Sequence, residues 1–183
     1  MERRGEACHG DGLTAVRSTC LALPEILGFL LLAAAQGPAH PPPPPGSALE
    51  RFFVGRTEGS GIVHIIMSGR HAVRDRATGR MQGGTLVLDQ VVEEEGKPAR
   101  RRVWRLTRGA ANAVTGTISD ARGAVAGEVS GATLHLRYRL AEGPSVEQWI
   151  TLQPGGRAAS NRMTIRRFGF NVATVETTVR RVD

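Results

Sequence analysis

The sequence predicts an all-β fold in which roughly eight to ten antiparallel strands follow one another as an up-and-down meander. From Phe53 to Val182, short runs of alternating apolar and polar residues are separated by glycine-rich turns, and no amphipathic helix interrupts them. A series of strands this long must bury one face and pair or cover its edges. A closed barrel and a two-sheet sandwich both do so, and hairpin connections throughout favour the meander.

The segment before the strands is predicted to be a signal peptide over residues 1–39. Residues 26–35 form an apolar run of signal-peptide length, with Arg3 among the arginines before it and with Ala33 and Ala35 at cleavage spacing. The run is too short to span a bilayer as a helix. We therefore expect export to the periplasm or cell envelope, with an uncleaved or unstructured tail as the alternative.

A proline-rich linker is expected over residues 40–48, because Pro41–Pro45 favours the extended polyproline II conformation. The barrel domain is then expected over residues 49–183. Both cysteines, Cys8 and Cys20, precede this domain. It therefore contains no disulfide and no cysteine-based metal site.

Regularly spaced glycine-containing turns divide the remaining chain into short elements. Ser47 is suited to cap a short helix over residues 48–53. Strands at a spacing of about 8–12 residues, separated by glycine-containing turns, are typical of barrels and sandwiches. The segments expected as strands are 56–67, 70–81, 84–94, 99–107, 112–120, 123–130, 132–141, 145–153, 158–167 and 170–182.

Alternation within these segments assigns side chains to the two faces of the sheet. Leu134, Leu136 and Tyr138 share one face, which we expect to be the inner one, whereas His135 and Arg137 share the other. The same reasoning points inward Trp104, Leu106, Val146, Gln148, Ile150, Ala159, Asn161 and Met163, and it points Trp149 outward.

Gly116 and Gly127 fall on the inner faces of consecutive predicted strands. Glycine inside a strand marks a bend, a bulge or the close approach of another group. These two glycines therefore either open space for a ligand or allow the sheet to coil tightly.

The formal net charge of +7 is carried almost wholly by arginine, with 23 Arg against one Lys. The arginines are spread along many strands and fall mostly on the predicted solvent face. A basic chain can bind an anionic membrane surface or nucleic acid, and a coding bias toward arginine explains the same composition. Nucleic-acid binding is disfavoured, because five Phe, two Trp and one Tyr leave few aromatic side chains for base stacking.

Several short motifs follow one another in order along residues 49–183. They are Phe52-Phe53-Val54-Gly55, Leu86-Val87-Leu88-Asp89, Arg102-Val103-Trp104-Arg105, Gly127-Glu128-Val129-Ser130-Gly131, Leu136-Arg137-Tyr138, Asn161-Arg162-Met163-Thr164 and Arg167-Phe168-Gly169. Together they resemble a bacterial family known as domain of unknown function 3833. The resemblance implies an exported or lipoprotein-like protein with a lipocalin-like (calycin) barrel, and it implies no particular activity. Ala132 stands where the family usually has Asn.

The few polar side chains expected on the inner face are the candidate ligand-binding residues. A mostly apolar pocket with a small number of orienting groups is typical of small-molecule sites. A filled core without a cavity would explain the same residues. The candidates are Arg102, Trp104, Tyr138, Gln148 and Asn161.

No catalytic residue, cofactor or metal site is predicted. His64, His71 and His135 match no metal-binding spacing. Gly59-Ser60-Gly61 lacks the helix that would make it a phosphate-binding loop. Glu93-Glu94-Glu95 precede a Gly-Lys-Pro turn, so they are expected at the solvated tip of a hairpin.

Three functions follow from this reading of the sequence. The favoured one is an exported barrel that binds a small apolar or amphiphilic, lipid-like molecule. The second is a cell-envelope interaction protein that uses its arginine-rich outer face on anionic lipid or on another protein. The third is an enzyme with an unrecognised site in the barrel mouth, which we regard as less well supported than passive binding.

Overall fold

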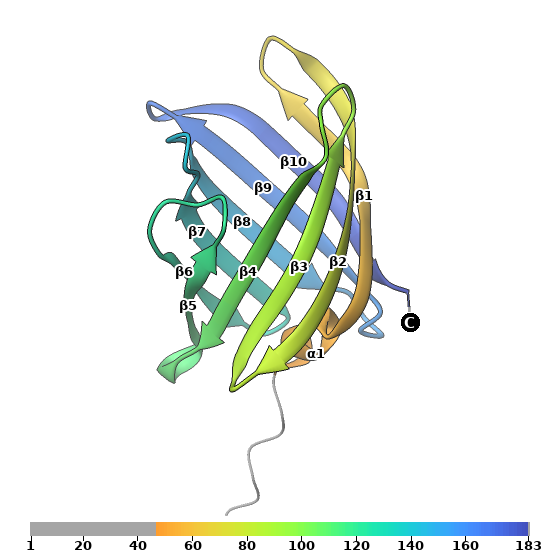
Figure 1. Cartoon of the computed structure of the whole chain (residues 1–183), viewed down its shortest axis with the longest axis vertical. Coiled ribbons are helices and arrows are strands. Elements are labelled where there is room, and N and C mark those ends of the chain that lie inside the picture. Colours follow the sequence, from red (N-terminus) through yellow and green to blue (C-terminus); the bar gives the residue numbers. More distant parts are fainter. Residues whose placement is uncertain (1–46, 183) are drawn as a thin grey trace, which may run out of the picture. The chain divides into compact units, whose positions relative to one another are not determined.

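The computed structural model of the protein describes residues 47–182. The predicted signal peptide and the linker up to residue 46 lie outside the described residues, as do both cysteines. The described chain forms a closed barrel of ten antiparallel strands with a short helix at its start (Figure 1).

Each strand pairs with the next one along the chain, and β1 pairs with β10 to close the barrel. The predicted short helix and all ten predicted strands are present, so the meander is confirmed and the barrel replaces the sandwich. The elements are α1 (Ala48–Phe53), β1 (Gly55–Ile65), β2 (Gly69–Gln82), β3 (Thr85–Glu94), β4 (Arg100–Arg108), η1 (Ala110–Asn112), β5 (Ala113–Ile118), β6 (Val125–Ser130), β7 (Thr133–Arg139), β8 (Ser145–Leu152), β9 (Ala158–Arg167) and β10 (Phe170–Arg181).

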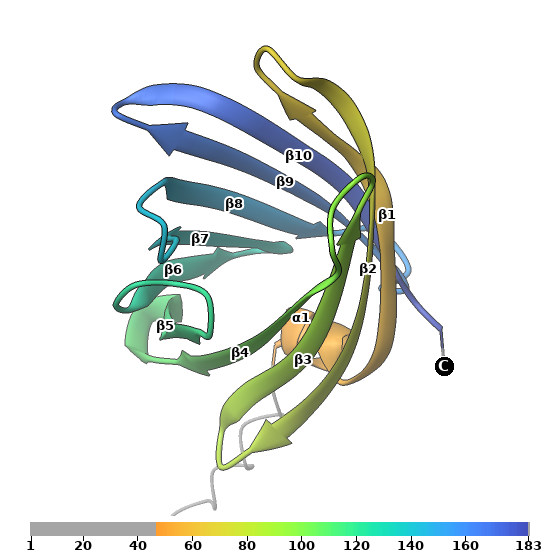
Figure 2. The same cartoon turned by 45° about the horizontal axis from the view of Figure 1, so that its top comes forward.

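Helix α1 lies at one end of the barrel, which we call the closed end (Figure 2). Ser47 and Glu50 form a reciprocal capping box that satisfies two of the helix's free backbone donors. Three side chains of this short helix, Leu49, Phe52 and Phe53, are buried in the barrel core. Within residues 47–182 no helix has both the length and the apolar character needed to cross a bilayer.

Gly79 of β2 lets α1 approach the barrel wall closely. A Cβ built on this glycine would lie 1.8 Å from the carbonyl oxygen of Phe53. Any other residue at this position would therefore push the end of the helix away from the sheet.

The predicted alternation of faces is confirmed along the strands. Leu134, Leu136 and Tyr138 are buried inside the barrel. On the outer face, Trp149 stacks on His135 with ring centroids 4.8 Å apart. The core has two parts: a large cluster that includes α1, and a small one of Val63, Val73 and Val175 nearer the opposite end.

Gly116 and Gly127 serve the tight coiling of the sheet. A Cβ on Gly116 would lie 1.9 Å from the carbonyl oxygen of Arg105, and one on Gly127 would lie 2.1 Å from that of His135. The neighbouring strand backbone thus occupies the space beside each glycine. Of the two interpretations left open by the sequence, close approach of the backbone is the one that the structure supports.

Candidate functional site: the barrel interior

Hydrogen-bonded side chains form a band across the inside of the barrel, with members on β2, β3, β4, β7, β8, β9 and β10. We call this band the polar girdle. It connects strands on both sides of the barrel, and its members are Asp75, Gln90, Trp104, Tyr138, Gln148, Asn161 and Thr177.

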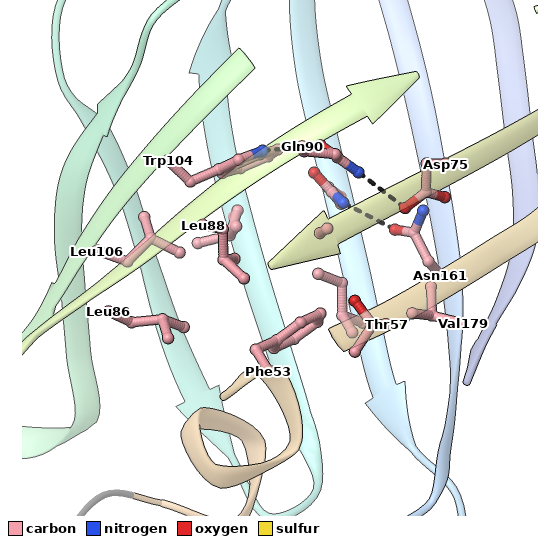
Figure 3. Close-up of a pocket in the computed structure, with 14 residues that line it drawn as sticks. Phe53, Thr57, Asp75, Leu86, Leu88, Gln90, Trp104, Leu106, Asn161 and Val179 are labelled. Carbon is pink, nitrogen blue, oxygen red and sulfur yellow. Dashed lines mark hydrogen bonds between the residues drawn. The ribbon is translucent and has the colours of Figure 1, made fainter. Parts of the chain in front are cut away.

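One half of the girdle runs across β4, β3 and β2. The indole Nε1–H of Trp104 donates to Gln90 Oε1 at 2.9 Å, and Gln90 Nε2 donates to Asp75 Oδ1 at 3.0 Å. This chain of bonds ends at a carboxylate, which Figure 3 shows beside the hollow in the barrel. Gly59 of β1 faces that carboxylate, and a Cβ there would lie only 2.0 Å from Asp75 Oδ2.

The other half runs across β7, β8, β9 and β10. The hydroxyl of Tyr138 donates to Gln148 Oε1 at 3.2 Å, and Gln148 Nε2 donates to Asn161 Oδ1 at 2.8 Å. Asn161 Nδ2 in turn donates to Thr177 Oγ1 at 3.0 Å. The oxygen and one N–H of each amide therefore have protein partners, which holds both side chains in fixed orientations. The edge contact of Trp104 with Tyr138 (centroids 5.8 Å apart) joins the two halves.

Two hollows lie on either side of the girdle, and five girdle residues line both of them. The inner hollow, with a cavity volume of about 60 Å³, lies between the girdle and α1 (Figure 3). Apart from the girdle its lining is almost wholly apolar: Phe53, Thr57, Ala77, Leu86, Leu88, Leu106, Leu136, Ile150 and Val179.

The mouth hollow, with a cavity volume of about 120 Å³, lies on the side away from α1. Its wall mixes aliphatic side chains with the charged groups of Glu94, Arg100 and Arg102. Charged side chains outside the girdle therefore line the mouth hollow and not the inner one. Such an arrangement suits a molecule with one apolar end and one polar end.

Arg102 holds the mouth side of the girdle in place. Its Nη2 pairs with Asp120 Oδ2 at 2.7 Å, and its guanidinium lies 6.0 Å from the ring centroid of Trp104. Burial raises the pKa of Tyr138, although the nearby Arg102 acts in the opposite direction. The phenol therefore stays protonated and donates its hydrogen bond to Gln148 at all physiological pH values.

Asp75 is a carboxyl group inside the barrel that has a hydrogen-bond partner, Gln90, and, within the described chain, no cationic side chain paired with it. Burial raises its pKa above the ordinary value of 3.8, while the Gln90 hydrogen bond and the positive charge of Arg102 lower it only in part. No ion pair to Asp75 occurs among the residues that the structure describes. A desolvated carboxylate with one satisfied oxygen, beside a hollow, is suited to accept a hydrogen bond from a ligand.

Replacing Asp75 by Asn is expected to stabilise the empty protein at neutral pH. In the unfolded chain this carboxyl titrates near 3.8, whereas in the folded barrel its pKa is higher. The folded state therefore binds more protons between these two values, so burying the group costs more free energy as the pH rises. The thermal midpoint of Asp75→Asn should exceed that of the wild type at pH 7, and the difference should shrink as the pH falls toward 3.8 and below.

Asp89→Asn is the matched control for this measurement. Asp89 lies on the exposed face and pairs with Arg80 at 2.5 Å. Its replacement should cost no more than about 1 kcal/mol, because exposed ion pairs contribute little. A wild-type protein that is more stable than Asp75→Asn at pH 7 would mean that the carboxylate has a stabilising partner.

The sequence-predicted candidates are distributed unevenly around the two hollows. Trp104, Gln148 and Asn161 line both of them, and Arg102 lines the mouth hollow. Tyr138 lines neither, and it acts through its bond to Gln148. Their proposed role in binding a ligand stays a prediction.

Sequence reasoning missed Asp75 and Gln90, and its prediction for Glu94 was wrong. Gln90 has the same strand parity as the buried Leu86 and Leu88, so alternation alone could have identified it. Glu94, expected at a solvated tip, points inward with 8 % of its side chain exposed and pairs with Lys97 at 2.6 Å. The strand ends at Glu94, as predicted, but this last side chain has the same inward parity as Leu86 and Leu88.

The histidines do not come together. His135 lies on the outer face between Trp149 and Glu147, and His71 Nε2 lies 3.2 Å from the carbonyl oxygen of Ser68 in a turn. Among residues 47–182 no group of three His, Cys, Asp or Glu side chains is placed to hold a metal ion.

Comparisons with known proteins agree with this architecture. Residues 43–181 match the sequence model of a family described as protein of unknown function (DUF3833). The structure is similar to that of an S-type phycobiliprotein lyase, CPES, from Guillardia theta, with a TM-score of 0.61 and 10 % sequence identity. The similarity covers 74 % of this chain and 91 % of the lyase chain, and at this identity it concerns the fold alone. A comparison with curated proteins gave no match.

Proposed function

The chain belongs to the DUF3833 family, and from that premise and the geometry of the interior we propose that its lipocalin-like barrel binds a slim amphiphilic molecule. The observation that carries this proposal is the Asp75 carboxylate, held by Gln90 between an apolar hollow and a hollow whose lining also includes charged side chains. The apolar part of the ligand would lie in the inner hollow and its polar end at the girdle. The similarity to a phycobiliprotein lyase is compatible with a barrel that holds a small molecule.

The size of the interior favours a single unbranched chain over a bulky ring system. The cavity volumes of about 60 and 120 Å³ are well below the roughly 300–1,000 Å³ of pockets that hold drug-sized molecules. Affinity would come from apolar burial at about 25 cal/mol per Å². The Leu86, Leu88 and Ile150 side chains are the expected contacts for the chain.

The chemistry of the girdle favours a hydrogen-bond donor at the polar end of the ligand. While it is ionised, the Asp75 carboxylate accepts hydrogen bonds and cannot donate one. Each amide nitrogen of the girdle already donates one of its two N–H groups to a protein partner, whereas Asp75 accepts one hydrogen bond, from Gln90. We therefore expect a ligand with a hydroxyl or amino head group to bind better than one with a carboxylate head group.

A tryptophan titration tests the proposal. The chain has two tryptophans, so Trp149→Phe leaves Trp104, in the girdle, as the single reporter. Decylamine, decan-1-ol and decanoate are added to this variant, and Trp104 emission is followed. Saturable change is expected, in the order decylamine, decanol, decanoate. Adding Asp75→Asn should weaken decylamine binding at least about tenfold, because hydrogen bonds to charged groups contribute roughly 1.5–3 kcal/mol.

Two outcomes would contradict the proposal in different ways. No saturable change with any of the three probes, together with no retained small molecule in native mass spectrometry, would refute binding in the barrel. Equal decylamine affinity with and without Asp75→Asn would refute the role of the carboxylate. The variant Asp89→Asn, which alters an exposed carboxylate, serves as the control for non-specific attraction of the amine.

We propose in addition that the protein is exported, as the pattern of residues 1–39 predicts. That segment lies outside the described residues, so the support comes from its apolar run and the small residues at the cleavage spacing. Fractionation of cells that produce the full chain checks this location, and a protein retained entirely in the cytosol would contradict it.

A further inference from the structure

The end of the barrel opposite α1 carries large apolar side chains exposed to solvent. They belong to two hairpin tips, one between β1 and β2 and one between β9 and β10 (Figure 2). Ile66 and Met67 are 54 % and 101 % exposed on the first tip, and Phe168 and Phe170 are 87 % and 75 % exposed on the second. We call these four residues the apolar rim.

Folding of the barrel does not account for the apolar rim. The four side chains bury little surface, so they add little to the core. Met67 and Phe168 also adopt positive φ angles of 72° and 52°, a left-handed conformation that is strained for bulky residues and free of strain for glycine. The two tips therefore hold large apolar groups in solvent at positions where a small residue would serve the turn better.

The two tips that carry the apolar rim are themselves basic, although Glu95 accepts a hydrogen bond from Ala72 N beside the first tip. Segments 65–71 and 166–171 contain three arginines and no Asp or Glu. The guanidinium of Arg167 lies 5.4 Å from the ring centroid of Phe168, and Arg166 pairs with Glu147 at 2.7 Å. Within the part of the chain that the structure describes, neither Arg70 nor Arg167 forms an ion pair.

From these observations we propose that the apolar rim docks the barrel mouth onto an anionic lipid bilayer. Exposed apolar side chains insert at the boundary between head groups and acyl chains, and flanking arginines are attracted to the negative surface. Two convex tips with four apolar residues offer too little area for a stable protein interface, which needs about 1,000 Å² in total. A bilayer requires no matching concave surface.

Docking in this orientation points the mouth hollow at the bilayer. The hollow lies on the side of the girdle away from α1, among the strand ends that lead to the two tips. An amphiphile could then pass between the membrane and the barrel without crossing water. The inference goes beyond ligand binding in the interior, because docking requires the rim residues and not the girdle.

Vesicle sedimentation with the purified chain tests the proposal. The protein is expected to bind vesicles of phosphatidylglycerol and phosphatidylcholine, to bind pure phosphatidylcholine much less, and to be released by salt. Met67→Ser with Phe168→Ser should reduce the bound fraction at least tenfold. The matched control is Met81→Ser with Val182→Ser, which removes two exposed apolar side chains (41 % and 42 % exposed) away from the rim, and it should bind as the wild type does.

A second pair of variants examines the charge. Arg70→Gln with Arg167→Gln should weaken binding and flatten its salt dependence, whereas Arg105→Gln with Arg108→Gln on the outer wall should do neither. Equal binding by the rim variants and the wild type would overturn the proposal. So would a concentration-dependent dimer that the rim variants abolish, because the rim would then pair two copies of the chain. Asp75→Asn should bind vesicles normally, so a failure of docking and a failure of the interior site are told apart.

Discussion

Replacement of Phe52 by alanine is expected to lower the free energy of unfolding by about 3–5 kcal/mol, the usual cost of truncating a buried phenylalanine. Phe52 is 2 % exposed and packs edge-to-face against Phe53, with ring centroids 4.9 Å apart. Its removal would leave a cavity beneath the only α-helix that the structure describes at the closed end. Urea unfolding followed by far-UV circular dichroism measures the loss.

Phe168→Ala is the control for the same chemical change in a different environment. Phe168 is 87 % exposed, so its truncation should change the stability by no more than about 0.5 kcal/mol. A loss of stability in Phe52→Ala that is no greater than in Phe168→Ala would mean that α1 does not belong to the cooperative core. The comparison therefore tests whether the helix and the barrel unfold together.

Gly116→Ala is expected to destabilise the barrel by about 3 kcal/mol, the upper part of the range for overpacking. The added methyl carbon would lie 1.9 Å from the Arg105 carbonyl oxygen and 3.0 Å from Leu106 Cα. These are backbone atoms of β4, which cannot move aside as a flexible side chain would. Relieving the clash therefore requires β4 and β5 to separate, which disrupts the pairing of Leu106 with Gly116.

Gly109→Ala provides the matched control in the same region of the chain. Gly109 has an ordinary φ of −102°, and its added Cβ would meet no atom closer than 3.8 Å. This variant should be as stable as the wild type or slightly more stable, because alanine reduces the entropy of the unfolded chain. If Gly116→Ala and Gly109→Ala had the same thermal midpoint, the close approach of β4 to β5 would not contribute to the stability of the barrel.

The strands could be predicted because each one repeats a two-residue alternation between turns that contain glycine. That local rule placed Trp104, Gln148 and Asn161 on the inner face, where the structure has them. Helix α1 could be predicted from Ser47 alone, because a capping box is also a local feature of the sequence. Closure into a barrel is a property of the whole sheet, and the family resemblance supported it more than the pattern did.

Asp75 was missed because its face of β2 has only a weak apolar signal. Its inward neighbours are Val73 and Ala77, and the exposed Arg74 and Arg76 lie on the other face, so strand parity directs Asp75 inward. What the parity could not show is that Gly59 of β1 is its register partner and leaves room for the carboxylate. The size of the hollows could not be predicted from the sequence either, because it depends on side chains that meet from opposite walls of the barrel.

The pairing of β1 with β10 also constrains how the chain folds. Thr57 and Arg181, near the two ends of the described chain, are register partners, so this part of the sheet forms only after nearly all other strands have been made. Until β1 and β10 pair, each of them presents an unpaired edge that can join another chain. Contacts so distant in sequence slow folding and lengthen the exposure of such edges. The strand that completes the barrel is therefore the one on which protection from aggregation depends.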